Sequence, residues 1–270
     1  MTASTGIDRL LLNMPVDFEI NGRIFWQLRE ILGDNFFLIG FRDEETKEKF
    51  SNVVLDVMLK LHSMRYHVDN FKQIEEQYLK SIETSEQGIF RTHRMLFEFE
   101  AFLFQLKSTL DITVKVLSVF LPNRFPTKTF RGKGVALCAS LEKYKHDKTC
   151  KTDLADNLIG VICDDREAWL EHAISLRDDI GHYRTLAEFN YHAVNHGTTR
   201  KITKPQIAGM PPLEYMQLTF QNCIEFVQDF LCIAVALAIP SQFGLSGANP
   251  NIGEPIAQYI KYGLGIRSAA

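Results

Sequence analysis

The chain has 270 residues, of which 46% are hydrophobic and 23% are charged. Disorder requires few apolar residues and a large net charge, so this composition excludes a largely disordered chain. The 30 Lys and Arg residues against 33 Asp and Glu residues give a net charge of −3, which excludes a uniformly basic nucleic-acid coating protein. A site for RNA or DNA would have to be a local patch.

The five cysteines are odd in number, widely spaced and without a C-x-x-C pair. This pattern opposes both a disulfide framework and a zinc site, and it favours a reducing cytoplasm. The N-terminal residues contain no apolar segment long enough for an export signal. The most apolar window, residues 231–240, is too short to span a bilayer. We therefore expect a cytoplasmic protein that does not enter a membrane.

The first strong structural signal is one apolar stripe on a long helix over residues 44–83. Apolar side chains recur there at steps of three or four residues, as on a helix with one buried face. They are Phe50, Val53, Val54, Val57, Leu61, Met64, Val68, Phe71, Ile74 and Tyr78. Before this helix, residues 1–42 have mixed character, and the segments 16–22 and 36–41 are predicted as short strands.

A second helix is predicted over residues 90–120, and it is apolar on more than one face. One stripe runs from Leu96 to Leu117, and further apolar residues, among them Phe97 and Phe104, widen it. A helix with this much apolar surface is typical of the centre of a bundle or of an oligomer interface. Pro122 and Pro126 end the helix because proline does not continue an α-helix.

The charge of the chain reverses between two neighbouring segments. Residues 122–151 are basic and include Lys143, Lys145 and Lys148, whereas the segment 152–171 is acidic. Such asymmetry predicts either a phosphate-binding patch beside an acidic surface or an ordinary mixed surface. We expect these three lysines to bind the backbone of a nucleic acid.

The C-terminal half is predicted to contain two more helices and one hairpin. A helix is expected over residues 152–180, and apolar residues then alternate with polar ones from 187 to 193, followed by a turn and a returning strand. Pro211-Pro212 opens the last helix, over residues 212–239. The tail, residues 241–270, has little periodicity, and we expect it to be loose or to dock on a neighbour.

Nothing in the sequence predicts a metal ion or another cofactor. A di-iron bundle requires two Glu-x-x-His pairs on facing helices, and no histidine here follows a glutamate by three residues. The patterns H-E-x-x-H and G-x-S-x-G are also absent, so metalloprotease and serine-hydrolase chemistry have no support.

One short segment, L-R-D-D-I-G-H-Y at residues 176–183, carries a recognisable motif. Its spacing, Arg177-x4-His182, with Asp178 after the arginine and Gly181 before the histidine, resembles the signature of the HEPN superfamily. This is an all-α group rich in RNases of toxin–antitoxin, phage-defence and RNA-processing systems.

The resemblance implies a fold, a division into domains and an assembly. It implies a mainly α protein with a HEPN-like helical bundle over residues 90–240, into which the hairpin at about 184–205 is inserted. Residues 1–89 would form an N-terminal α(+β) extension, and residues 241–270 a C-terminal tail. Family members place two motifs face to face across a two-fold axis, so the resemblance implies a homodimer. RNA is the implied substrate, and an antitoxin or another defence-system protein is an implied partner.

Two features of the sequence qualify this resemblance. A second match to the spacing, Arg166-x5-His172, fits less well because glutamates follow its arginine and precede its histidine. Some toxin members carry a tyrosine two residues after the histidine, whereas here Tyr183 follows His182 directly and Arg184 takes the later place. We expect Tyr183 and Arg184 to contact the substrate, but the chain departs from that subgroup.

RNA cleavage without a metal requires a base for the 2′-hydroxyl, an acid for the leaving oxygen and a cation for the phosphorane. His182 can transfer protons at neutral pH, and Arg177 can hold phosphate oxygens through paired hydrogen bonds. Asp178 is assigned an orienting role. Residues five apart on a regular helix point about 140° apart. Either Gly181 kinks the helix, or two chains contribute to one site.

The leading hypothesis is a homodimeric, metal-independent endoribonuclease of toxin–antitoxin or phage-defence systems. The alternative is a catalytically inactive HEPN-like module that binds a nucleotide, an RNA or a protein partner, in which Arg177 pairs with a carboxylate such as Asp153 or Asp156. A third hypothesis is a helical interaction protein. An open Arg177 and His182 at a dimer axis favours the enzyme, and burial in pairs within one chain opposes it.

Overall fold

The computed structural model describes residues 20, 24, 43–83, 88–90, 92–121, 125, 129–182, 189–196, 199–238, 243–246 and 265–268. Its α-helices are α4 (Glu44–Glu83), α5 (His93–Phe120), α6 (Val135–Tyr144), α7 (Thr152–Asp165), α8 (Glu171–His182) and α9 (Pro212–Ala238). Its strands are β1 (Gly88–Phe90), β2 (Tyr191–His196), β3 (Thr199–Thr203), β4 (Phe243–Ser246) and β5 (Gly265–Ser268). The predicted mainly helical class with a small sheet is therefore confirmed.

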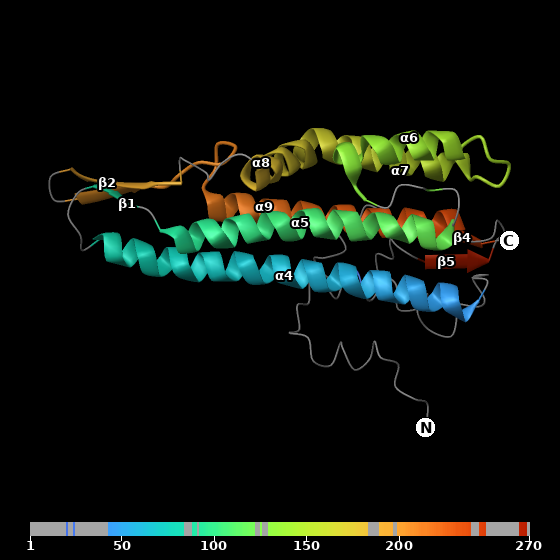
Figure 1. Ribbon diagram of the computed structural model, residues 1–270, viewed down its shortest axis with the longest axis horizontal. Helices are drawn as coiled ribbons and strands as arrows, with labels where there is room; N and C mark the ends of the chain where they lie inside the picture. The colour runs from blue at the N-terminus through green and yellow to red at the C-terminus, as the bar shows by residue number, and fades with distance from the viewer. Residues whose placement is uncertain are drawn as a thin grey trace, which may run out of the picture.

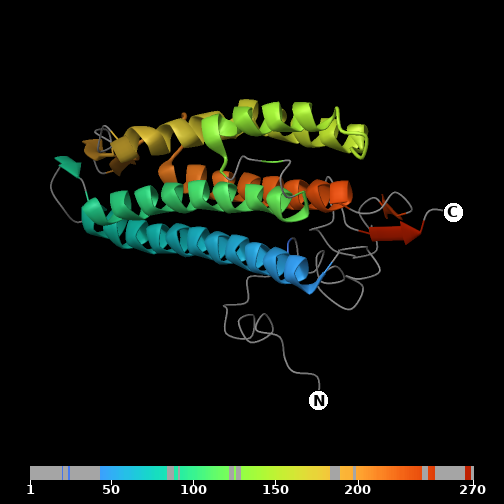
Figure 2. The same ribbon diagram turned by 45° about the vertical axis from the view of Figure 1, so that its right-hand side comes forward.

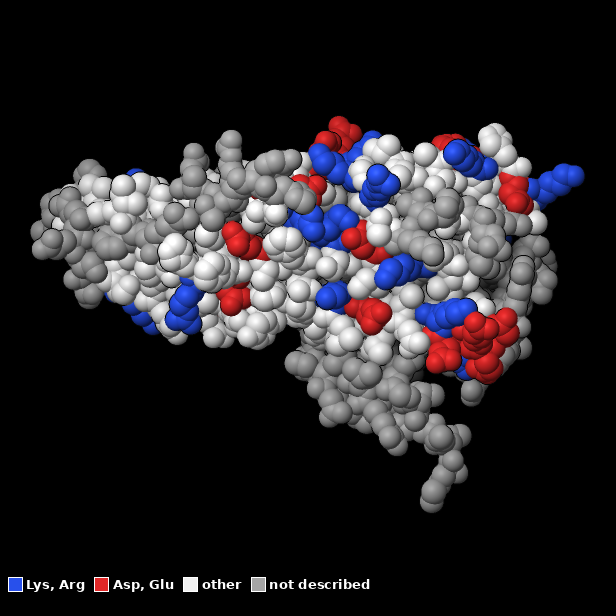
Figure 3. All heavy atoms as spheres, viewed as in Figure 1, with Lys and Arg blue, Asp and Glu red and all other residues white. Residues whose placement is uncertain are grey.

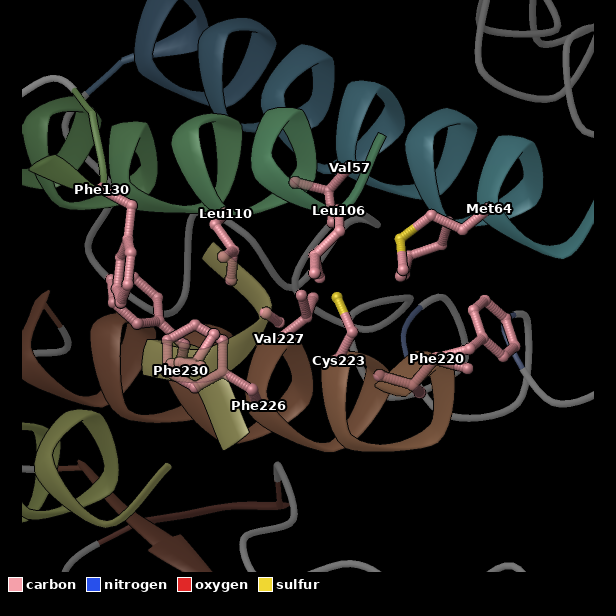
Figure 4. Packing of buried hydrophobic residues seen from close by; sticks show 14 of the residues in the cluster. Val57, Met64, Leu106, Leu110, Phe130, Phe220, Cys223, Phe226, Val227 and Phe230 are labelled. Carbon is pink, nitrogen blue, oxygen red and sulfur yellow. The ribbon is translucent and has the colours of Figure 1, made fainter. Parts of the chain in front are cut away.

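The long helices α4, α5 and α9 lie side by side and form the main core (Figures 1 and 2). Val57 and Met64 of α4 and Leu106 of α5 point toward α9, where Cys223 and Val227 meet them (Figure 4). All five side chains are buried. The apolar stripe predicted over residues 44–83 is thus the face of α4 that packs on the other two helices.

Helix α9 is the most apolar element of the bundle. Among the described residues, it is the one helix long and apolar enough to cross a membrane, and 83% of its apolar window is buried inside the molecule. Every residue from Phe226 to Leu237 is buried. Because more than three helical turns are buried on all sides, α9 needs partners on opposite faces.

A second layer lies on the side of α5 and α9 away from α4 (Figures 1 and 2). Helix α7 packs antiparallel to α6. It continues through a wide π-type turn, η4 (Arg166–Leu170), into α8. The predicted helix over residues 152–180 is therefore confirmed as one rod with a wide turn. We call the unit from α6 to α8 the arm.

Two contacts fix the arm to α9. The ring of Phe130, just before α6, packs against Phe226 with centroids 5.7 Å apart (Figure 4). Lys151, at the start of α7, donates a hydrogen bond from Nζ to the carbonyl oxygen of Ala236, at 2.7 Å. This lysine satisfies a carbonyl of the last turn of α9, where a positive charge also suits the helix dipole.

The predicted hairpin is confirmed, and a third strand joins it. β2 pairs antiparallel with β3 and, on its other side, with β1. Phe189, Tyr191 and Ala193 are buried and His192 is exposed, as the alternation predicts. Strand β1 has only three residues, which is too short to produce a readable period in the sequence.

A buried carboxylate joins this sheet to α4. Glu75 is 3% exposed, and it accepts hydrogen bonds from the Tyr191 hydroxyl at 2.7 Å and from Lys204 Nζ at 2.8 Å. The ring of Tyr78 meets that of Tyr191 edge to face, with centroids 5.5 Å apart. A buried charge of this kind is tolerated only because both partners are in place.

Several boundaries differ from the sequence prediction. Helix α5 begins at His93 rather than at residue 90, because the Thr92 side chain caps its first turn by accepting from the Arg94 amide. In the tail, β4 and β5 pair antiparallel, which the sequence did not predict. Ile20 is helical, so the first predicted strand, at 16–22, is wrong at this position. The other residues of that strand and the predicted strand 36–41 lie outside the described residues.

The domain boundary predicted at residue 89 runs through one continuous core. Side chains of α4, α5 and α9 belong to the same buried cluster, together with those of the arm. The part of the N-terminal segment that the structure describes, α4, is therefore an integral helix of the bundle.

We expect Gly134→Ala to destabilise the fold strongly. Gly134 has φ +89°, and a Cβ there would lie 2.7 Å from Ile162 Cγ2 and 2.8 Å from Phe130 Cζ. Backbone strain and overpacking together should lower the free energy of unfolding by about 2–4 kcal/mol. The matched control is Gly160→Ala within α7, where a Cβ meets nothing within 4 Å, and it should raise stability by about 0.5–1 kcal/mol. Urea denaturation measures both, and equal stabilities would contradict the packing described.

We expect Lys204→Met to destabilise the protein more than Lys201→Met. The first change leaves the buried Glu75 carboxylate with Tyr191 as its remaining described donor, whereas Lys201 is exposed on β3. Because the Lys204 side chain is 33% exposed, the loss should be about 1–3 kcal/mol, below that of a fully buried pair. The control should change the free energy of unfolding by less than about 0.5 kcal/mol. Similar melting curves for the two variants would mean that solvent satisfies Glu75.

Candidate functional site

Arg177 lies on α8 where that helix packs on α5. Its guanidinium carbon is 4.9 Å from the centre of the Phe104 ring, and Nη1 donates to Asp178 Oδ1 at 2.7 Å. The aromatic face and the carboxylate together hold the guanidinium in one position. The arginine side chain is 25% exposed, so it lies at the edge of the α5–α8 seam rather than in the core.

The guanidinium has an unused donor. The Nε atom of Arg177 is buried and has no hydrogen-bond acceptor among the residues that the structure describes. An unpaired buried donor costs about 1–3 kcal/mol, so an anionic oxygen that reached it would bind favourably. The carboxylate that pairs with the Arg177 guanidinium is that of Asp178, rather than that of Asp153 or Asp156 as the alternative hypothesis expected.

His182 is the last residue of α8, and the helix continues through Gly181 to reach it. The kink at Gly181 that would bring Arg177 and His182 together is therefore not present. A Cβ at position 181 would lie 3.5 Å from Phe104 Cζ, which is an ordinary contact, so the space beneath the helix does not require glycine. Positions 178 and 182 are four residues apart and fall along one stripe of α8, whereas position 177 falls on the neighbouring face.

Lys133 is brought onto this stripe from outside α8. Its Nζ donates to Ser175 Oγ at 2.7 Å and lies 3.2 Å from Glu171 Oε1. Glu171, Ser175 and Asp178 follow one another at steps of three or four along α8, so Lys133 lies on the stripe that leads to the motif.

The backbone of Lys133 is strained. Its φ is +56°, between Gly132 at +58° and Gly134 at +89°, and a non-glycine residue rarely adopts this region. The sequence R-G-K-G signals a left-handed turn through its glycines. It gives no indication that the turn delivers a lysine to a helix 38 to 42 residues further along the chain. Sequence reasoning counted Lys133 in the basic segment 122–151 but did not single it out as a site residue.

The predicted substrate-binding lysines lie at the other end of the arm. Lys145 is paired with Asp156 at 2.6 Å and with Glu142 at 3.1 Å, and Lys143 and Lys148 are exposed nearby. Asp156 precedes Arg177 by 21 residues on the rod, which is about 30 Å at 1.5 Å per residue. Within one chain, the structure does not bring these lysines to the motif.

The basic segment 122–151 and the acidic segment 152–171 form ion pairs with each other in the fold. The antiparallel packing of α6 on α7 sets basic side chains beside acidic ones, as in the Lys145–Asp156 pair. Lys and Arg are interspersed with Asp and Glu over the described part of the face shown in Figure 3. On this face the expectation of an ordinary mixed surface fits better than that of a continuous basic patch.

One face of α5 beside the motif exposes large apolar side chains. Phe97 is 62% exposed and Phe104 is 39% exposed, and the two are seven residues apart on one side of the helix. α5 and α8 run in opposite directions (Figure 1). Because Gly181, near the end of α8, lies over Phe104, Phe97, seven residues nearer the start of α5, lies beyond the end of α8. Between the two rings, burial raises the pKa of the Glu100 carboxyl. Exposed aromatic side chains that are grouped in this way are typical of a contact surface.

The remaining motif residues have other surroundings. His172, from the second match to the spacing, lies with Nδ1 3.0 Å from the Tyr215 hydroxyl, so it is tied to α9. Tyr183 and Arg184 lie outside the described residues. Among the described residues, no three His, Cys, Asp or Glu side chains are grouped so that they could hold a metal ion.

Comparisons with protein-family models, with curated proteins and with solved structures gave no match to this chain.

Proposed function

We propose that this protein is a metal-independent endoribonuclease of HEPN type, with a composite site formed by two copies of the chain. The observation that carries the proposal is the placement of Arg177. Its guanidinium is held against Phe104 and Asp178, and its Nε lacks an acceptor among the described residues, in a motif whose histidine ends the same helix. A mainly helical bundle is consistent with the all-α architecture of that group.

In the proposed reaction the 2′-hydroxyl of RNA attacks the adjacent phosphorus. His182 removes the hydroxyl proton or donates a proton to the leaving 5′-oxygen, and Arg177 stabilises the charge of the phosphorane. The bond from phosphorus to the 5′-oxygen breaks as the bond to the 2′-oxygen forms. The products are a 2′,3′-cyclic phosphate and a free 5′-hydroxyl. Asp178 acts as a positioning residue because it fixes the Arg177 guanidinium.

Two chains are needed because one helix presents Arg177 and His182 on different faces. A two-fold axis near the end of α8 would bring the arginine of one copy toward the histidine of the other. Phe97 and Phe104 support this arrangement, since they expose apolar surface beside the motif. Lys133 would then add a second cation for the RNA backbone.

A catalytically inactive HEPN-like module is the second candidate function, and one observation favours it. Arg177 already pairs with Asp178, and Asp179 and Glu171 add further negative charge on α8. This acidic setting weakens attraction for a phosphate. In that case the same surface would bind a protein partner, such as an antitoxin. The cytoplasmic location and a role in toxin–antitoxin or phage-defence systems belong to the proposal in either form.

We expect Arg177→Ala and His182→Ala each to reduce RNA cleavage by about 10²–10⁴-fold while circular dichroism stays unchanged. The double variant should lose less than the product of both effects, since both residues serve one transition state. Asp178→Asn should reduce cleavage less. The assay uses pure protein with labelled RNA in EDTA, and it identifies the cyclic phosphate by mass spectrometry. Cleavage of a 2′-deoxy substrate, or activity that requires magnesium, would refute the mechanism.

We expect Lys133→Gln to weaken RNA binding and to flatten the dependence of log K on log salt by about 0.7 for one lost phosphate contact. The triple variant at Lys143, Lys145 and Lys148 should change binding less, because these lysines lie about 30 Å from Arg177 in the same chain. Fluorescence anisotropy at several salt concentrations measures both. The opposite order would place the RNA along the far end of the arm.

We expect light scattering to show a dimer at micromolar concentration, and Phe97→Asp to convert it to a monomer. A charge on this exposed face would be buried without a partner in the proposed interface. The control is Tyr66→Asp on α4, because Tyr66 is 61% exposed and Phe97 is 62% exposed. This control should remain dimeric. A wild-type monomer would argue against a composite site.

A further inference from the structure

Two half-buried free cysteines lie on the two antiparallel helices of the arm. They are Cys138 on α6 and Cys163 on α7. The register of these helices is fixed near their connection, where Lys145 Nζ lies 2.6 Å from Asp156 Oδ1. The position of each cysteine relative to the other can be derived from this ion pair.

The two cysteines stand at matching positions. Cys138 is seven residues before Lys145, and Cys163 is seven residues after Asp156. Seven residues are almost two full turns, so each cysteine lies on the same side of its helix as the paired charge, within about 20°. Because the helices are antiparallel, both steps lead in the same direction along the hairpin. This register therefore places the two thiols at one level on facing sides of the helices, and the Cys163 thiol acts on the pKa of Cys138.

The surroundings of Cys138 disfavour its thiolate form. Burial, followed by the neighbouring Cys163 thiol, raises the pKa of Cys138 to about 12, although the positive charge of Arg166 acts in the opposite direction. Cys138 is therefore protonated at neutral pH and is a poor first nucleophile.

We propose that Cys138 and Cys163 form a reversible disulfide that cross-links α6 to α7 when the protein is oxidised by a peroxide. The Cys163 sulfur attacks one peroxide oxygen, which gives a sulfenic acid and releases water. The Cys138 sulfur then attacks the sulfenic sulfur, the S–S bond forms, and the displaced hydroxide takes the Cys138 proton to give a second water. Two thiols and one hydrogen peroxide thus yield one disulfide and two water molecules. Reduction by a dithiol restores both thiols.

The disulfide would stabilise the arm, which also carries the motif on α8. A cross-link between residues 138 and 163 closes the hairpin on itself and restricts the unfolded chain, which stabilises the folded state. The inference does not depend on RNA cleavage, since it rests on the packing of α6 against α7 alone.

The test treats the full chain with a small excess of hydrogen peroxide and follows the intact mass and the peptide map. We expect the mass to fall by two hydrogens, a linked peptide that contains Cys138 and Cys163, and a melting temperature raised by roughly 5 °C or more. Addition of dithiothreitol should reverse all three changes. Cys138→Ser and Cys163→Ser should each abolish the link.

The control variant is Cys150→Ser. Cys150 is also half-buried and lies in the connection between α6 and α7, but it does not stand at the matching level. This variant should form the link as the wild type does. Oxidation that stops at sulfenic or sulfinic acid, or a link that uses Cys150 in the wild type, would overturn the proposal.

Discussion

The burial of α9 on all of its faces is the constraint on which the rest of the structure depends. Twelve consecutive residues of this helix are buried, so it must be covered from opposite sides. α4 and α5 cover one side, and the arm covers the other through contacts such as Phe130 against Phe226 and Lys151 on the Ala236 carbonyl. The arm also packs on α5, and this second contact is where Arg177 meets Phe104. The candidate site thus lies at the edge of a core that α9 organises.

The elements that could be predicted from the sequence are those whose periodicity records a buried face. The stripe from Phe50 to Tyr78 gives α4 with the bounds that the structure has, and the alternation around Tyr191 gives the buried side of β2. Short strands such as β1 carry too few residues for a period. The pairing of β4 with β5 depends on contacts between segments about twenty residues apart, which no local pattern expresses.

The candidate site was predictable only in part, for a physical reason. Arg177 and His182 share one local segment, so their helix and their spacing follow from the sequence. The partners of Arg177 have different origins: Asp178 is adjacent in the chain, whereas Phe104 comes from another helix. Lys133 reaches α8 because a strained turn and the path of the arm carry it there, whereas the more numerous lysines at 143, 145 and 148 stay with α6 and its connection to α7. Local charge density is therefore a poor guide to which cation reaches a site.

The wide turn η4 sets the rotational phase of α8. Buried positions on α7 include Leu158 and Ile162, and a regular helix would continue them at 165 and 169; instead they resume at Leu170 and Ile174, one place later. A wide turn holds one residue more than a regular turn, which corresponds to about 100° of rotation about the helix axis. In a chain lacking one residue between 166 and 170, the rod would be regular and its buried positions would stay on the face that continues Leu158 and Ile162. A regular turn that kept every residue would instead rotate α8 by about 100°, and α8 would present a different face to α5. Arg177 would then leave Phe104, although every residue of the motif would be unchanged. The width of this turn, which accommodates one extra residue, therefore decides where the motif points.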